Sequence, residues 1–480
     1  MAALVLAAFA YRIAYWLLLG RVIDTADAIH YLNAAQTFAE GGFLSADPRI
    51  PPLYPLLTAC LGGLLQVHLE TAACLISLAA GSLALVPICG IARKLHGPSS
   101  ARVMALLFIL WPWLVDCAAR VSPDALAILL WFSGLLAFAK AVRGEGSFWK
   151  PAVLYFLLHL TRPEGVLIAV ASCAASVALI DRETRTTLGA RPLRWASGLL
   201  LFATMFAGYL LWMRAATGEF VLSPRIGQPA EALQYALVDR GKDTAKAFLQ
   251  LFSHTLPVML GPYLLCLAGF GLLHTHPAIR RDFRLECFLL LMASAQFVVA
   301  GLSTHAEPRY LMATTVALSI FACRGMIIAG DAWGHKHHLL RRAPVWVLAL
   351  LLVAGMAAVA APRWMGRMSY QPIEYKIAGE WMKAHLEPGL VFTRKPQVGY
   401  YAGMPTTGPA QTDTLDQAID RAQAAGARYF VVDERYSTQM VPSLKPLLDP
   451  AHAPPELKLV EAGLSPLAEA RIVIYEIVAP

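Results

Sequence analysis

Long apolar runs separated by short polar loops make up most of the first 361 residues. Runs that match the ~30 Å hydrocarbon core of a membrane, or nearly do, lie at about 3–19, 71–92, 100–118, 125–142, 151–161, 165–180, 195–214, 255–275, 285–302, 310–330 and 343–361. The pattern predicts a polytopic α-helical membrane protein with about eleven transmembrane helices.

The apolar stretch "PPLYPLLTACLGGLLQV" (51–67) is shorter and opens with two prolines. We expect an interfacial or re-entrant helix that belongs to the first outer loop, residues 20–67. If 51–67 crossed the membrane fully, every later loop would lie on the opposite side of the membrane, and the basic loops would face outward.

The pattern changes from about residue 370. "IAGEWMKAHLEPG" (377–389) and "TDTLDQAIDRAQAAGA" (412–427) have helical spacing, whereas "LVFTR" (390–394) and "ARYFVVDERY" (427–436) are typical of buried strands. Alternating strands and helices predict a small α/β domain. We therefore expect a transmembrane domain over 1–361 and an extracytoplasmic α/β domain over 362–480.

Composition supports the membrane assignment. Of the 480 residues 57% are apolar and 15% charged, and the mean hydropathy of +0.54 lies outside the range of soluble domains. The eight cysteines lie in or beside apolar runs and form neither a disulfide framework nor a zinc motif. The first apolar run starts almost at Met1 without a basic region or a cleavage site, which predicts a membrane helix rather than a signal peptide.

The net charge of +8 reflects topology rather than nucleic-acid binding, because the basic residues cluster in alternate short loops. These residues are Arg93, Lys94, His96, Arg143, Lys150, Arg182, Arg185, Arg191, Arg194, Arg280, Arg281, Arg284, Lys336, Arg341 and Arg342. The positive-inside rule places those loops in the cytoplasm. The other loops, including the long 215–254 loop, and the C-terminal region then face outward, toward the periplasm if the membrane is a bacterial inner membrane.

The first outward loop contains "DTADAIHY" (24–31). A helix that begins near Asp24 places Asp24, Asp27, His30 and Tyr31 on one face. Two carboxylates beside an imidazole and a phenol can serve acid–base chemistry. Alternatively, Asp24 or Thr25 caps the helix and Asp27 complements its dipole.

Three further outward loops carry charged side chains next to apolar spans. Asp124 begins a membrane helix, Arg162 and Glu164 separate two short apolar runs, and a third loop contributes His305, Glu307 and Arg309. Charges at such depths are costly and usually face a bundle interior or a polar cavity. Four such loops on one side predict a functional cavity.

These motifs resemble the C-type membrane glycosyltransferases, which include protein O-mannosyltransferases and the aminoarabinose transferase of lipid A. Family members carry an Asp four residues before an aromatic residue, as in Asp27 and Tyr31, and a Pro-Pro-Leu-Tyr segment that ends here at Tyr54. "SPDA" (122–125), "LTRPEG" (160–165) and "HAEPRYLM" (305–312) also match. The aminoarabinose transferase tends to carry a basic residue directly before the Pro-Pro pair, and Ile50 stands there in this chain.

The resemblance implies transfer of a sugar, with inversion, from a polyprenyl-phosphate donor to a lipid, glycan or protein acceptor outside the membrane. Asp27 is expected to act as general base and Asp124 to orient the acceptor or the surroundings of Asp27. Arg162 and Arg309 are expected to neutralise the departing lipid phosphate.

The remaining predicted contacts of the substrates are His30, Tyr31, Tyr54, Glu164, His305 and Glu307. A divalent metal is compatible with the acids and histidines among these residues and Asp27, although no spacing requires one. The alternative function is a lipid or glycan transporter or flippase, for which charges near the middle of the membrane and repeated halves are typical.

Overall fold

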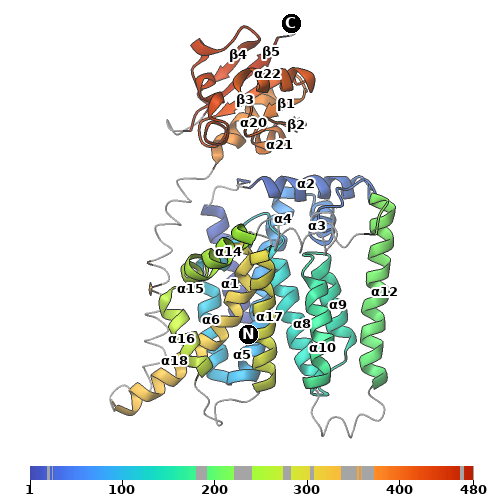
Figure 1. The fold of residues 1–480 in the computed structure, drawn as a ribbon, viewed down its shortest axis with the longest axis vertical. Coiled ribbons are helices and arrows are strands. Elements are labelled where there is room, and N and C mark those ends of the chain that lie inside the picture. Colours follow the sequence, from blue (N-terminus) through green and yellow to red (C-terminus); the bar gives the residue numbers. More distant parts are fainter. Residues whose placement is uncertain are drawn as a thin grey trace. The chain divides into compact units, whose positions relative to one another are not determined.

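The computed structural model describes residues 1–18, 22–23, 25–179, 192–220, 241–273, 283–302, 308–336, 354–355, 358, 372–464 and 470–478. Contacts divide the chain into two compact units. The first comprises Met1–Trp16 and Tyr31–Trp364, and the second comprises Leu17–His30 and Met365–Pro480. Figure 1 shows the mainly helical first unit and the strands of the second.

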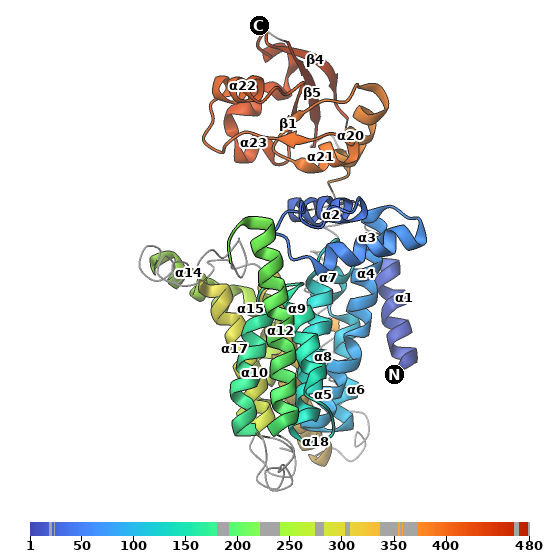
Figure 2. The ribbon, with the colours of Figure 1, turned by 90° about the vertical axis from the view of Figure 1, so that its right-hand side faces the viewer.

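The first unit is built from apolar helices. Their bounds are α1 (Ala2–Leu18), α2 (Ala26–Ala39, shared with the second unit), α3 (Leu53–Leu65), α4 (Leu69–Leu83), α5 (Leu85–His96), α6 (Pro98–Leu110), α7 (Pro112–Ala118), α8 (Asp124–Val142), α9 (Trp149–His159), α10 (Gly165–Leu179), α12 (Pro192–Thr217), α14 (Gly241–Gln250), the π-helix η3 (Leu251–Thr255), α15 (Leu256–Leu260), α16 (Pro262–Leu273), α17 (Phe283–Leu302), the 3-10 helix η4 (Pro308–Leu311) and α18 (Met312–Lys336). Figure 2 shows α8, α9, α10 and α12 running side by side.

Within the described residues, five helices are long and apolar enough to cross a membrane, or up to seven if each bent pair is one span. The chain is therefore an integral membrane protein, but the predicted count of eleven spans is not confirmed. Most of the predicted span 343–361 lies outside the described residues. The helix in 51–67 is α3, with 13 residues, and it packs on α4.

Two predicted spans are bent rather than straight. Helices α6 and α7 meet at 58°, at Trp111, and Lys242–Leu260 meets Tyr263–Leu273 at 100°. Prolines explain both breaks, because Pro112 and Pro262 lack the amide hydrogen that continues a helix. Gly261 also has a φ of 76°, which favours glycine. Part of the predicted 215–254 loop is helical, since α14 and η3 lie there.

The first bend explains a buried arginine in α1. Pro112 cannot donate to the carbonyl oxygen of Phe108, four residues earlier. Arg12, which is fully buried, donates to that oxygen from Nη2 at 3.1 Å. A side chain from another helix thus satisfies a backbone group that would otherwise lack a partner in hydrocarbon.

A buried ionic cluster joins α5, α17 and α18. Glu286 Oε1 lies 2.9 Å from Nη1 of Arg324 and 3.3 Å from Nε2 of His96. All three side chains are almost inaccessible to solvent. We call this set the Glu286 cluster. It connects helices that are far apart in the sequence, and it lies at the end of α5 that carries the basic loop residues Arg93 and Lys94.

The second unit contains a mixed five-stranded sheet of order β2-β1-β3-β5-β4. The strands are β1 (Val391–Thr393), β2 (Thr406–Thr407), β3 (Tyr429–Asp433), β4 (Leu457–Ala462) and β5 (Ile472–Ile477). The helices are α20 (Ile373–His385), α21 (Pro396–Ala402), α22 (Leu415–Ala424) and α23 (Ser437–Met440), with 3-10 helices η6 (Pro442–Leu448) and η7 (Pro450–His452). Strands β1, β2 and β3 are parallel, and β5 is antiparallel to β3 and β4.

Two apolar clusters form the core of this unit. One contains Phe392, Phe430 and Val473 with residues of α22 and η6, and the other contains Val391, Val431 and residues of α20 and α21. Successive residues of a strand point to opposite faces, so the two clusters cover the two faces of the sheet. The predicted strands within 390–394 and 427–436 and the two predicted helices are confirmed.

Helices α16 and α18 pack closely through glycine. A Cβ atom on Gly271 would lie against the carbonyl oxygen of Phe321 and 2.9 Å from the amide nitrogen of Gly325. A Cβ atom on Gly325 would lie against the carbonyl oxygen of Leu267. Small residues at such positions let membrane helices approach each other.

Gly271→Ala should therefore destabilise the protein by about 1–3 kcal/mol, because the added methyl group forces α16 away from α18. Gly269→Ala is the matched control, since a Cβ atom at Gly269 meets nothing within 4 Å on the same helix. Thermal unfolding in detergent measures both variants. Equal melting temperatures for the two would contradict the close packing.

Candidate functional site

An ion pair joins two loops of the first unit. Asp124, the first residue of α8, binds Nη2 of Arg162 through Oδ1 and the hydroxyl of Ser122 through Oδ2 at 2.8 Å. Arg162 also lies 3.4 Å from Oε1 of Glu164. The Asp124 and Arg162 side chains are only 8% and 16% exposed. Asp124 compensates the charge of this buried guanidinium and fixes its position.

The loop before Asp124 is held by Tyr54 of α3. This tyrosine is fully buried, and its hydroxyl accepts a hydrogen bond from the Ser122 amide at 3.1 Å. The same hydroxyl lies 2.9 Å from the Ala73 carbonyl oxygen and 2.9 Å from the Ser77 hydroxyl oxygen, and it shares its single proton between them. Ser77 in turn donates to the Ser122 carbonyl oxygen at 3.0 Å. Tyr54 therefore positions the start of α8.

The Arg162 loop is attached to the same segment. The amide of Leu53, at the start of α3, donates to the carbonyl oxygen of Leu160 at 2.9 Å. The short "Pro-Pro-Leu-Tyr" turn thus binds the 160 loop through Leu53 and the Ser122 loop through Tyr54. Both members of the Asp124–Arg162 pair depend on this turn for their place.

A pocket lies beside the ion pair. Its empty space, counted out to open solvent, is about 310 Å³. The lining residues come from α8, α9, α17 and α18, from the 3-10 helix η4 and from the loop between α9 and α10. They are Asp124, Ala127, Ile128, Trp131, Leu158, Arg162, Glu164, Gln296, Arg309, Met312 and Ala313. The pocket therefore has an apolar wall and a charged one.

Two arginines belong to the charged wall. Both contact the ring of Tyr310, whose centroid lies 5.5 Å from the guanidinium carbon of Arg162 and 5.1 Å from that of Arg309. Both distances fit cation–π contacts. Two guanidinium groups in one pocket suit a phosphate, which accepts paired hydrogen bonds in their fork geometry.

The structure thus brings together Asp124, Arg162, Glu164 and Arg309 among the predicted site residues. Sequence reasoning missed Gln296, Trp131 and Tyr310. Gln296 of α17 accepts from the Thr314 amide at 2.8 Å and from the Thr314 hydroxyl at 3.0 Å. An amide in an apolar span was the available signal for it.

Tyr31 and Tyr54, which belong to the same unit, are not among the residues that line this pocket. Asp27 is half-buried in the first turn of α2, and His30 is exposed. Thr25 caps α2, because its hydroxyl accepts from the Ala28 amide at 3.3 Å. The helix end therefore has a cap other than Asp27.

Tyr31 is half-buried and contacts the ring of Tyr54 edge-on, with 5.7 Å between the ring centroids. Asp24, His305 and Glu307 lie outside the described residues. Among the residues that the structure does describe, no three His, Cys, Asp or Glu side chains are grouped to hold a metal ion.

Residues 49–212 match the family described as dolichyl-phosphate-mannose-protein mannosyltransferase. Among solved structures, ArnT from Cupriavidus metallidurans bound to undecaprenyl phosphate is similar, with a TM-score of 0.65 and 15% sequence identity over 99% of this chain and 98% of ArnT. The chain has the fold of the C-type membrane glycosyltransferases. The resemblance suspected from the sequence is thereby confirmed.

Two further C-type structures match over less of their own length. The Archaeoglobus fulgidus oligosaccharyltransferase tethered with an acceptor peptide gives a TM-score of 0.53 at 11% identity, over 92% of this chain and 72% of that one. The mycobacterial arabinofuranosyltransferase AftD gives 0.53 at 15% identity, over 98% and 41%. No curated protein matches the chain.

The role of Tyr54 in this C-type fold is testable with Tyr54→Phe. The variant leaves the Ser122 amide without the partner it has in Tyr54, so we expect it to cost about 1–3 kcal/mol of stability. Thermal unfolding in detergent measures this loss. Tyr263→Phe is the control, because Tyr263 is 73% exposed.

A double variant with Ser77→Ala separates the network from general damage. Tyr54 and Ser77 share one hydrogen bond, so their combined loss should be smaller than the sum of the single losses. Strict additivity would show that the two hydroxyls act independently.

Proposed function

We propose that the protein is a glycosyltransferase that moves a sugar from a polyprenyl-phosphate donor to an acceptor, with inversion at the anomeric carbon. The observation that carries this proposal is the pocket in which Arg162 and Arg309 both contact the Tyr310 ring, in a chain with the C-type fold. ArnT, which is similar over nearly its whole length, was crystallised with undecaprenyl phosphate. The acceptor is a lipid, a glycan or a protein.

The phosphate of the donor is assigned to the charged wall of the pocket. Asp124 and Glu164 compensate Arg162 and hold its guanidinium in place. Arg309 lies across the Tyr310 ring. When the bond from the sugar to the phosphate breaks, negative charge grows on the departing phosphate, and preoriented guanidinium groups stabilise it. Asp124 is then a positioning residue for Arg162.

The general base is assigned to Asp27. Thr25 already caps α2, so Asp27 is not needed for that purpose. Its carboxylate would remove the proton of the acceptor hydroxyl as that oxygen attacks the anomeric carbon. His30 and Tyr31, on the same helix, would contact the sugar or the acceptor.

Asp27→Asn should lower the rate of transfer by a factor on the order of 10² to 10⁴ while the protein stays folded, because an amide cannot take the proton. The measurement uses purified protein, a polyprenyl-phosphate sugar and a panel of acceptors. Asp24→Asn is the control within the same loop and should retain most of the activity. Equal, mild losses at both positions would remove Asp27 from the base role.

The same assay separates the enzyme from a transporter. A flippase would move the lipid-linked sugar across the bilayer without breaking the bond from the sugar to the phosphate. Release of free polyprenyl phosphate in step with product therefore supports transfer, and movement without release contradicts it.

The charged pocket and the second unit are proposed to face the outside of a bacterial inner membrane, since the basic loops define the cytoplasmic side. In a background without the eight native cysteines, Ala451→Cys should react with an impermeant reagent in intact cells. Gly146→Cys, in the basic loop after α8, should react only after permeabilisation. The opposite pattern would reverse the proposed orientation.

A further inference from the structure

The second unit has a place where open α/β sheets bind ligands. Strand β1 has the parallel neighbours β2 on one side and β3 on the other. The chain leaves β1 toward β2 and later returns to the opposite side of β1 to form β3. Loops that follow the carboxyl ends of such strands diverge and leave a crevice. The two loops concerned begin at Arg394 and at Glu434.

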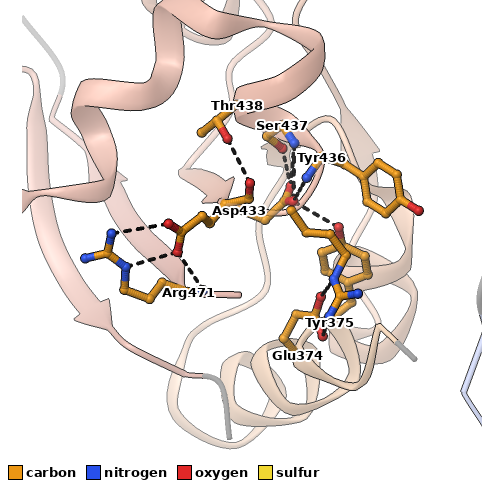
Figure 3. A network of polar contacts seen from close by, with 9 residues as sticks. Glu374, Tyr375, Asp433, Tyr436, Ser437, Thr438 and Arg471 are labelled. Carbon is orange, nitrogen blue, oxygen red and sulfur yellow. Dashed lines mark hydrogen bonds and ion pairs between the residues drawn. The ribbon is translucent and has the colours of Figure 1, made fainter. Parts of the chain in front are cut away.

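The loop after β3 is held rigidly by a buried carboxylate (Figure 3). Asp433, which is 2% exposed, accepts hydrogen bonds from the amides of Tyr436 at 2.6 Å and Ser437 at 3.2 Å. It also accepts from the Tyr375 hydroxyl at 2.9 Å and from the Ser437 hydroxyl. The ring of Tyr436 is thereby held at the surface, where it is 42% exposed.

The charges that follow Asp433 are compensated within the unit. Arg435 lies 2.5 Å from Glu374, which is fully buried, and Glu434 lies 3.1 Å from Arg471. Together with the hydrogen bonds to Asp433, these pairs give both acids of the loop partners within the unit.

The loop after β1 differs, because its charges form no ion pair with a described carboxylate. Within the described residues, neither Arg394 nor Lys395 has a carboxylate at ion-pair distance. The Lys395 ammonium lies over the Tyr436 ring instead, 3.6 Å from its centroid. Gln397 in the same segment is fully buried, and neither polar atom of its amide has a hydrogen-bond partner in the described part of the chain. Polar groups left in this way call for an external partner.

Burial lowers the pKa of Lys395 below its ordinary value, and Arg394 adds to the effect, while Asp433 opposes it. An anion bound here would stabilise the charged form of Lys395, which burial and the neighbouring charge of Arg394 destabilise. The electrostatics of the loop thus agree with its geometry.

We propose that Arg394, Lys395 and Tyr436 form a binding site for a phosphate group at the carboxyl ends of β1 and β3. The Arg394 guanidinium supplies paired donors, and the Lys395 ammonium supplies a point charge. The phosphate belongs either to a soluble sugar phosphate or to a lipid headgroup. The site is separate from the Arg162 pocket and does not rest on the proposed transfer reaction.

The test measures protection of Lys395 from an amine-reactive reagent in the full-length protein, quantified by mass spectrometry. Pyrophosphate or glucose 1-phosphate, added to protein in nonionic detergent, should lower the modification of Lys395 severalfold. Lys458 is the internal reference, because this exposed lysine lies on the edge strand β4. Its modification should not change.

A second arm distinguishes the two sources of phosphate. Protein in nanodiscs of phosphatidylglycerol is compared with protein in phosphatidylcholine, whose headgroup has no net charge. Protection only with phosphatidylglycerol assigns the site to a lipid headgroup, and protection by the soluble probes assigns it to a sugar phosphate. Absence of protection in both arms, or equal protection at Lys458, would overturn the proposal.

Two variants separate this site from damage to the fold and from catalysis. Arg394→Gln should raise the probe concentration needed for half-maximal protection about tenfold, since it removes one charged donor. Arg394→Lys should retain most of the protection. Protection equal to wild type in Arg394→Gln would exclude the arginine from the site. Asp27→Asn should show wild-type protection, so loss of transfer and loss of phosphate binding are distinguishable.

Discussion

The ion pair between Asp124 and Arg162 is the interaction on which the pocket depends. Removing the Arg162 guanidinium from water is costly, and the carboxylate of Asp124 offsets that cost. The geometry of the pair comes from α3, whose Tyr54 and Leu53 bind the loops of the two partners. The Tyr310 ring contacts both Arg162 and a second cation, Arg309. Segments more than 180 residues apart along the chain thus become one site.

The charged residues of this pocket could be predicted from the sequence, because a charge next to an apolar span is costly and usually faces a bundle interior or a polar cavity. Asp124, Arg162 and Arg309 were all predicted in this way. Tyr54 was found as part of a motif, but its positioning role was not, because a buried hydroxyl has no signature of its own in a sequence. Gln296 and Tyr310 were missed for a similar reason. Their meaning depends on neighbours from other helices.

The fold was predictable to the extent that each element is determined locally. The helix at 415–424 follows a capping box of Thr414 and Gln417, which is a local sequence signal. Strand β3 is a nearly continuous apolar run. Strands β4 and β5 were not predicted. In β4 charged residues interrupt the apolar ones, and the strand depends on pairing with β5 for its place. The bends at Trp111 and Gly261 follow from visible prolines. Their angles depend on packing, as the contact of Arg12 with Phe108 illustrates.

The Glu286 cluster has a consequence for how the protein is made. Glu286 lies in the first turn of α17, whereas its partner Arg324 lies in α18, which is synthesised later. An acid that enters the bilayer without a partner is costly. His96 is already present on α5, but it compensates Glu286 only when it is protonated. We therefore expect α17 and α18 to enter the membrane together, as a helical hairpin, so that the ion pair forms during biogenesis rather than after it.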